Sequence, residues 1–342
     1  MYIVDSFNVA ILMCVITMIC WGSHANMLKM QSKGYSYSYY YWDQAIGYLL
    51  LPLILALTMG SIGSNGEGFI SNLLNADASS WWWAISAAFV FNLANIIFVA
   101  AVDIAGMAIA FPIGMGFSLV LGVILNYIAK PEGNPVLIFA GMVCVVIAII
   151  INARAYAGMS TKDEDKAMMK KGIKLAIIGG FLMGLFYYLL QNSMPTILNS
   201  DSLSNIAGTG KFTPYSAVVV FAAASFLSNF IYNSYIMRHP FKGQPVTYKG
   251  YFAKGTARDH VIGLVGGMIN ATGTTFNIIA SGMVGAAIAY GLGQSNPMIA
   301  AIWGVFVWKE FRKAPLGTNK LIVLMFLFFA TGVTLLTLSK LV

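Results

Sequence analysis

The sequence is divided into stretches of about twenty consecutive apolar residues, and this pattern limits the folds open to it. A helix needs about 20 such residues to cross the hydrocarbon core of a bilayer. Charged residues make up 9% of the chain, whereas a soluble domain carries about 25%. The sequence therefore predicts an all-α integral membrane protein with ten transmembrane helices, at residues 7–28, 39–60, 81–102, 105–128, 135–156, 173–193, 213–237, 260–281, 283–307 and 321–340.

Lysine and arginine gather in every second loop between these spans. Of the 20 basic residues, all but Lys130, Lys211 and Lys340 fall on one side of the expected membrane. Loops with an excess of lysine and arginine are cytoplasmic in most membrane proteins. We therefore expect a multi-pass protein of the inner or plasma membrane with both termini on the extracytoplasmic side.

The charged segment 157–172 divides the spans into two sets of five, in residues 1–156 and 173–342. Because five is odd, two copies of one five-helix fold must be inverted relative to each other, as in many secondary transporters. The stretch 106–114 (GMAIAFPIG) also reads against 285–293 (GAAIAYGLG), in the equivalent position of the second set. The sequence predicts two inverted five-helix repeats joined by a cytoplasmic linker.

Polar residues form a stripe in the third span and another in the eighth. They are Asn92, Asn95, Asp103, Asn270, Thr274 and Asn277. An amide in hydrocarbon needs a partner or a wet cavity. The two spans hold equivalent places in the two halves, so we expect both stripes to face one solute-binding cavity. For any single amide, hydrogen bonding between helices is the alternative.

Other spans supply further candidates for the wall of this cavity. They are Trp21, His24, Asn26, Tyr187, Gln191 and Gln294. An aromatic ring such as Trp21 can stack on a flat ligand or a sugar face, or it can anchor the chain at the membrane interface. Histidine has an unperturbed pKa near neutrality, so His24 can relay protons, or it can be a neutral histidine held between helices.

Asp43 is the acidic candidate for coupling transport to protons. A protonated carboxyl group carries no charge inside the membrane, which suits a proton carrier. The alternative is an ion pair with Lys29 or Lys33 at the cytoplasmic end. For Glu310, a salt bridge to Arg312 or Lys313 is the economical interpretation.

Two prolines fall within equivalent spans of the two halves. Pro297 follows Tyr290, Gln294 and Asn296, and Pro112 lies in the fourth span. Proline removes a backbone hydrogen bond inside a helix. We expect both spans to break or bend there and to act as hinges.

Several function classes are disfavoured by what the sequence lacks. The segment 208–211 (GTGK) lacks the earlier glycine of a phosphate-binding loop, and no HExxH motif is present. No basic stretch with interleaved aromatic residues points to nucleic acid. We expect no enzyme activity, no cofactor and no nucleic-acid partner. The expected partners are the lipid bilayer and a small-molecule solute, for a monomer or a homodimer.

Several segments resemble the ureide permease family. They are the opening MYIVDS, the run ICWGSHANMLK, the motifs YYYWDQ and LTMGSIG around the second span, and the long stretch GGMINATGTTFNIIASGMVGAAIAYGLGQSNPMIAAIWGVFVWKEFRKAP. That last stretch includes Trp303, Gly304, Glu310, Phe311 and Arg312. The resemblance covers most of the chain and is weakest in the middle.

This resemblance implies the ten-helix fold of the drug/metabolite transporter superfamily, which also includes glucose/ribose porters and rhamnose–proton symporters. It implies uptake of an oxo-heterocycle, such as allantoin or uracil, by alternating access with a proton. Asp43 and Glu310 match acidic positions of the family. The compact middle segment is similar to a bacterial member, for which transport of a monosaccharide is the alternative. A passive channel and a non-transporting membrane protein are further alternatives.

Overall fold

The computed structural model describes residues 1–342 apart from 64–65, 106, 158–165, 196–204 and 242–243. The described residues form helices and contain no β-strand. The helices are α1 (Phe7–Ser23), α2 (Tyr37–Leu57), α3 (Phe69–Asn75), α4 (Ala78–Ala105), α5 (Met107–Ala129), α6 (Pro135–Ala157), α7 (Lys166–Gln191), α9 (Pro214–Ser228), α10 (Tyr232–Arg238), α11 (Tyr248–Lys254), α12 (Ala257–Val284), α13 (Ala286–Gly293), α14 (Pro297–Ile302) and α15 (Thr318–Leu338).

Each expected span corresponds to a helix or to a chain of short helices. Within the described residues, eight helical segments are long and apolar enough to cross a membrane, and α9 and α10 together form one of them. The prediction of an all-α integral membrane protein is therefore confirmed at this level. The two remaining spans, the first and the ninth, depart from a single long helix.

The first span ends its α-helix earlier than expected. The α-helix α1 has 17 residues and passes into a 3₁₀ helix at His24–Met30. Side chains compete for the carbonyl groups of the last turn, because Asn26 Nδ2 donates to the Gly22 carbonyl and His24 Nδ1 lies 2.9 Å from the Trp21 carbonyl oxygen. Local side-chain hydrogen bonds of this kind favour helix ends.

The ninth span is interrupted, as Pro297 predicts. It consists of α13, a turn at residues 294–296, α14 and a π-helical turn at Trp303–Val307. Gly285, which separates α12 from α13, has φ of 94°, a conformation that favours glycine. The expected break at Pro112 is wrong, since α5 continues through that proline. Pro112 is the sixth residue of α5, so it removes one hydrogen bond near the start of the helix, and α5 continues past this loss.

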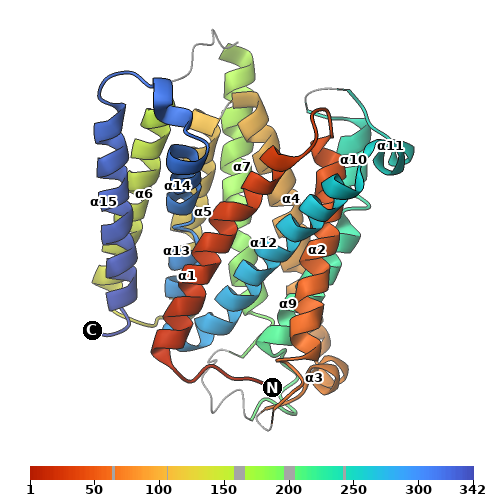
Figure 1. The fold of residues 1–342 in the computed structure, drawn as a ribbon. Helices are drawn as coiled ribbons and strands as arrows, with labels where there is room; N and C mark the ends of the chain where they lie inside the picture. The colour runs from red at the N-terminus through yellow and green to blue at the C-terminus, as the bar shows by residue number, and fades with distance from the viewer. Residues whose placement is uncertain (64–65, 106, 158–165, 196–204, 242–243) are drawn as a thin grey trace.

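The helices pack into one bundle (Figure 1). The helix α12 packs against α1 and α2, α7 packs against α4 and α5, and α6 packs against α15. Glycine permits the closest approach, between α2 and α12. A Cβ atom added at Gly267 would lie 2.0 Å from the Gln44 carbonyl oxygen, and one at Gly47 would lie 2.0 Å from the Leu264 carbonyl oxygen. The two backbones are therefore in direct contact.

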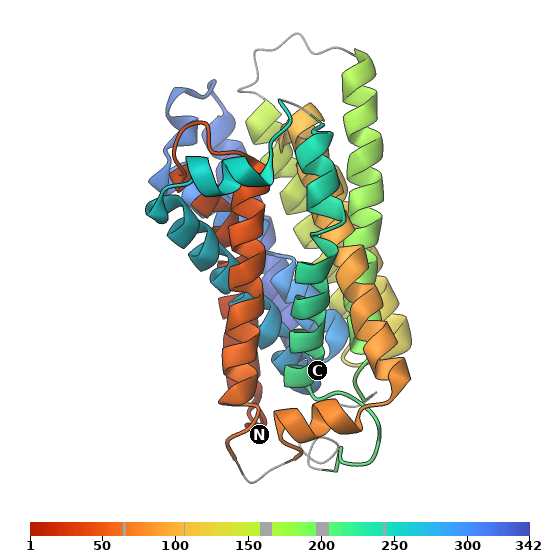
Figure 2. The same ribbon diagram turned by 90° about the vertical axis from the view of Figure 1, so that its right-hand side faces the viewer.

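Both chain termini lie at one end of the bundle (Figures 1 and 2). The opposite end carries residues 24–36, α11 and residues 308–317, and we call it the basic end because the described members of the expected cytoplasmic lysines and arginines lie there. Half of the expected linker 157–172, residues 158–165, falls outside the described residues.

Candidate functional site

A polar cluster lies inside the bundle where α7, α12 and α13 meet. Tyr187 packs against Tyr290 with 4.8 Å between ring centroids, and both side chains are fully buried. The Tyr290 hydroxyl lies 2.7 Å from the Ser118 hydroxyl and 3.0 Å from the Met183 carbonyl oxygen. Gln191, one turn after Tyr187, donates from Nε2 to the Ser281 hydroxyl at 2.9 Å. These contacts connect α5, α7, α12 and α13.

Several oxygen atoms in this cluster have no hydrogen-bond partner among the described residues. They are Gln191 Oε1, Asn277 Oδ1 and Gln294 Oε1, while the Tyr187 hydroxyl faces Gln191 and Ser281 without a well-aligned hydrogen bond. Four other such oxygens lie elsewhere, on Gln31, Asn126, Asn152 and Ser225. Buried polar atoms in proteins are nearly always paired with protein or water. The cluster can therefore accept hydrogen bonds from a small molecule that carries N–H or O–H groups.

The Asn277 side chain is held in place by a hydrogen bond from its amide nitrogen. Its Nδ2 atom donates to the Ala289 carbonyl at 2.8 Å. A Cβ atom added at the neighbouring Gly293 would lie 2.9 Å from that Nδ2 atom and 2.7 Å from the Trp21 ring. Trp21 and Asn277 therefore both pack closely against Gly293 of α13.

Trp21 joins this cluster through Thr274. Its indole Nε1 donates to the Thr274 hydroxyl at 3.3 Å, and the Tyr48 hydroxyl donates to the same atom at 2.8 Å. The structure thus brings together Trp21, Tyr187, Gln191, Thr274, Asn277 and Gln294 of the predicted set. Sequence reasoning missed Tyr48 and Ser281 as members, although both are polar residues within expected spans.

Asn92 lies apart from this cluster. Its Oδ1 atom accepts from the Tyr41 hydroxyl at 2.7 Å, and its Nδ2 atom donates to the Ser228 hydroxyl at 2.6 Å and to Asn229 Oδ1 at 3.0 Å. The expectation that Asn92 faces the same centre as the α12 stripe is wrong for this conformation, because α2 and α9 occupy its hydrogen-bonding atoms. Asn92 holds three helices together.

The remaining predicted residues are more peripheral. Asn95 and Asn270 are half-buried, and the side chain of Asp103 lies outside the described part of the structure. Asn26 lies at the basic end, where its Oδ1 atom accepts from Trp308 Nε1 at 2.7 Å. A second indole contact, from Trp303 Nε1 to the Ser23 hydroxyl at 2.9 Å, lies beside it. His24 begins the 3₁₀ helix between these contacts.

Asp43 is buried at the basic end and has three partners. Its carboxylate accepts from the Tyr35 hydroxyl at 3.0 Å and from the Tyr251 hydroxyl at 2.5 Å, and its Oδ1 atom lies 2.9 Å from His260 Nδ1. The alternative of an ion pair with Lys29 or Lys33 is wrong. Sequence reasoning missed His260 and both tyrosines, which come from α12, α11 and the loop before α2.

The two tyrosines stay protonated in this network. Burial, and after it the Asp43 carboxylate, raises the pKa of Tyr35 above its ordinary value. Burial and the hydrogen bond to Asp43 likewise raise the pKa of Tyr251. A hydroxyl with a raised pKa remains a hydrogen-bond donor, so both groups stabilise the ionised carboxylate. Asp43, His260 and the two tyrosines therefore form one hydrogen-bonded network.

Glu310 forms a second network at the basic end. Its carboxylate pairs with Lys29 and accepts from the Tyr156 hydroxyl at 2.7 Å. The expected salt bridge to Arg312 is wrong, and the side chain of Lys313 lies outside the described part of the structure. Lys29 and Glu310 belong to opposite ends of the sequence, as do Asp43 and His260. Both networks therefore join the first half of the chain to the second.

Comparisons with known proteins agree with the sequence pattern. The model of the ureide permease family matches residues 40–171 and 157–339. Ureide permease 1 and ureide permease 2 of Arabidopsis thaliana are 22% and 23% identical to this chain, and each alignment covers 99% of both proteins. A probable ureide permease A3 of Vigna unguiculata is 20% identical over 92% of this chain and 98% of its own length.

The fold also has a solved counterpart. A crystal structure aligns with a TM-score of 0.61 over 96% of each chain, at 14% sequence identity. This likeness concerns the fold alone. Together with the apolar helices, the permease relatives show a multi-pass membrane protein.

Proposed function

Because the chain belongs to the ureide permease family, we propose that it is a secondary active transporter for a small, neutral polar solute. Membership of a permease family makes it a transporter rather than an enzyme. The most specific form of the proposal is uptake of a ureide or nucleobase-type oxo-heterocycle by alternating access, with a proton as the coupling ion and no cofactor.

The observation that carries the solute class is the set of unpaired oxygens in the central cluster. Gln191, Asn277 and Gln294 supply acceptors that no described protein group satisfies, beside the Tyr187 hydroxyl. Ureides and nucleobases carry several N–H donors on a flat ring. The donors would pair with these oxygens, and the ring would stack on Trp21 or on the Tyr187–Tyr290 pair. The route to this cluster would be lined by His24, Asn26, Asn95 and Asn270. Asn92 would hold together the helices that surround it.

We further propose ten membrane spans in two inverted repeats, residues 1–156 and 173–342, with 157–172 as the linker. The helix packing supports this. If each helix is exchanged for its counterpart five spans away, the contact of α1 with α12 becomes that of α7 with α4. The contact of α2 with α12 likewise becomes that of α9 with α4. A two-fold relation between inverted halves produces this exchange.

Alternating access requires one end of the bundle to be closed while the other opens. The Asp43 and Glu310 networks would close the basic end, which we propose is cytoplasmic, in the inner or plasma membrane, with both termini outside. Release of solute to the cytoplasm would then break contacts between the halves. Protonation of Asp43 would weaken its pairing with His260, which links the proton to that opening.

The proposal is tested by ligand-dependent thermal stability and by transport in proteoliposomes. Purified protein is heated with allantoin, uracil, glucose, ribose or rhamnose, because a ligand that binds the folded state raises the apparent Tm. Saturable, pH-gradient-driven uptake and counterflow of the stabilising compound are expected. Stabilisation by a monosaccharide alone would assign a sugar, and non-saturable flux without counterflow would indicate a channel.

A further inference from the structure

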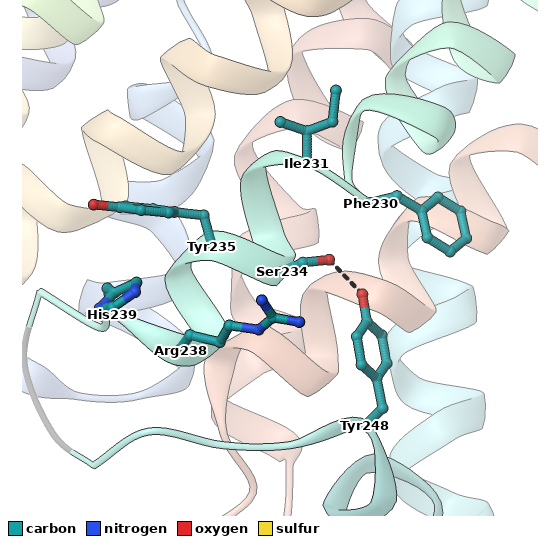
Figure 3. Close-up of a pocket in the computed structure, with 7 residues that line it drawn as sticks. All are labelled: Phe230, Ile231, Ser234, Tyr235, Arg238, His239 and Tyr248. Carbon is teal, nitrogen blue, oxygen red and sulfur yellow. Dashed lines mark hydrogen bonds between the residues drawn. The ribbon is translucent and has the colours of Figure 1, made fainter.

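A cavity of about 460 Å³ lies on the outside of the bundle at the junction of α10 and α11. It is distinct from the central cluster and from both networks of the basic end. Its lining residues are Phe230, Ile231, Ser234, Tyr235, Arg238, His239 and Tyr248 (Figure 3). In Figure 2 the helices α9 and α10 lie on the near side of the bundle, between α2 and α4.

The cavity arises where the seventh span is interrupted. The helix α9 ends at Ser228 and α10 begins at Tyr232, so the chain turns at residues 229–231. Phe230 and Ile231 project outward from this turn and are 55% and 59% exposed. Exposed apolar side chains within an otherwise apolar span face lipid rather than water.

The inner wall of the cavity is rigid. The buried Trp42 ring of α2 packs against Phe230 with 4.9 Å between ring centroids and against Tyr248 at 5.8 Å. Its Nε1 atom lies 3.3 Å from the Met237 sulfur. The site is therefore supported by buried packing beneath it.

The polar side of the cavity is basic and rich in donors. Arg238 closes the apolar segment Pro214–Arg238 and forms no ion pair within the described residues. The hydroxyls of Ser234 and Tyr248 are hydrogen-bonded to each other, and the Arg238 side chain extends toward them in Figure 3. A cation at the end of a membrane span lies at the depth of lipid headgroups.

From this arrangement we propose that the cavity binds an acidic phospholipid of the cytoplasmic leaflet. The phosphate would pair with Arg238 and accept a hydrogen bond from whichever of the Ser234 and Tyr248 hydroxyls does not donate to the other. One acyl chain would lie along Phe230 and Ile231. The proposal rests on the positive charge of Arg238 and on its position at the depth of lipid headgroups, since basic pockets beside cytoplasmic helix ends bind anionic headgroups. The proposal depends on the basic end being cytoplasmic, which the proposed function also requires.

Native mass spectrometry of the detergent-purified protein tests the proposal. Added dioleoyl phosphatidylglycerol is expected to remain bound, whereas dioleoyl phosphatidylcholine, with the same acyl chains, is not. Arg238→Gln is expected to lower the apparent affinity for phosphatidylglycerol about fivefold, the ratio expected for one basic residue near a membrane surface. Arg238→Lys keeps the charge and is expected to retain most of the binding.

The matched control is Arg258→Gln, an exposed arginine of the same basic segment that does not line the cavity. Its affinity for phosphatidylglycerol is expected to equal that of the unmodified protein, and a thermal scan shows that each variant is folded. Equal retention of both lipids, or equal losses in Arg238→Gln and Arg258→Gln, would overturn the proposal.

Two further outcomes would also overturn it. Displacement of the lipid by inorganic phosphate or glycerol 3-phosphate at similar concentrations would assign a soluble anion. A dimer that excludes lipid would assign a second copy of the chain to this face. Because the assay reads lipid binding and not transport, failure here leaves the proposed transport of solute standing.

Discussion

The Nδ1 atom of His260 lies 2.9 Å from the Oδ1 atom of Asp43, although the residues are 217 positions apart in the sequence. The contact joins the start of α12 to α2. It lies near Gly47 and Gly267, where the backbones of the two helices are in direct contact. Gly263, one turn after His260, faces the Asp43 side chain, and a Cβ atom added there would lie 2.3 Å from Asp43 Cβ. The carboxylate therefore sits in a position that leaves little room for water.

Asp43→Asn is expected to abolish uptake driven by a pH gradient while leaving solute exchange. An amide of the same shape keeps one acceptor oxygen, so it can accept from only one of Tyr35 and Tyr251, and it cannot bind and release a proton. The measurement is radiolabelled uptake in proteoliposomes with and without a pH gradient, and counterflow at equal pH. Asp5→Asn, an exposed acid, is the control and is expected to behave as the unmodified protein. Concentrative uptake by Asp43→Asn would remove Asp43 from the coupling role.

Two tyrosine-to-phenylalanine substitutions in the central cluster are expected to affect different properties, stability for one and solute affinity for the other. Tyr290→Phe leaves the groups around Ser118 and Met183 without a partner and is expected to destabilise the protein by about 1–3 kcal/mol. Tyr187→Phe removes a hydroxyl whose contacts with Gln191 and Ser281 are poorly aligned. It is expected to keep the Tm but to lower solute affinity. Thermal scans with and without the stabilising solute check both; an unchanged affinity in Tyr187→Phe would place the solute elsewhere.

Gly267→Ala is expected to destabilise the fold by about 1–3 kcal/mol, because the added methyl group overpacks the α2–α12 contact. Gly116→Ala is the matched control, since a Cβ atom at Gly116 meets no described atom within 4 Å. Alanine there should be neutral or stabilising, because it favours the helix more than glycine does. The comparison is made by thermal unfolding in one detergent. Equal effects of the two substitutions would contradict the close packing.

Lys130 is expected to make stability depend on pH between about 8 and 10.5. Burial lowers the pKa of Lys130 from 10.5 to about 8, while its Nζ atom donates to the Pro195 carbonyl at 2.9 Å. In this interval the unfolded chain binds more protons than the folded chain, so stability rises with pH. Below pH 8 Lys130 is charged in both the folded and the unfolded chain, so the burial of its charge lowers stability by a constant amount.

Lys130→Met tests this dependence, because methionine is of similar length and cannot titrate. Its Tm is expected to rise less than that of the unmodified protein as the pH is raised from 8 to 10. Lys33→Met, at an exposed lysine of the basic end, serves as the control. Parallel Tm curves for Lys130→Met and the unmodified protein would show that Lys130 is not the group responsible.

Local sequence signals predicted the helices and part of the site. Span length and loop charge depend on neighbouring residues alone, so they located the helices and the two ends of the bundle. Pro297 marked the interruption of the ninth span, because a missing N–H acts within one turn. The stripe through Thr274 and Asn277 followed from helical periodicity, and both residues lie at the central cluster.

Pairings between distant residues could not be predicted. Proximity in sequence offered Lys29 or Lys33 as the alternative partner of Asp43, whereas the fold supplies His260 and pairs Lys29 with Glu310. Asn92 illustrates the same limit, since periodicity gives the face of α4 but not the helices packed on it. The effect of Pro112 depended on where α5 begins, which a run of apolar residues does not define.

Two indole N–H groups hold the extension of α1 to the π-helical turn after α14, through Trp303 with Ser23 and Trp308 with Asn26. A displacement of either segment must carry the other with it unless both bonds are lost together. In the alternating access that we propose, the end of α1 and the turn after α14 would therefore move together, so a moving body would contain chain from both halves of the sequence.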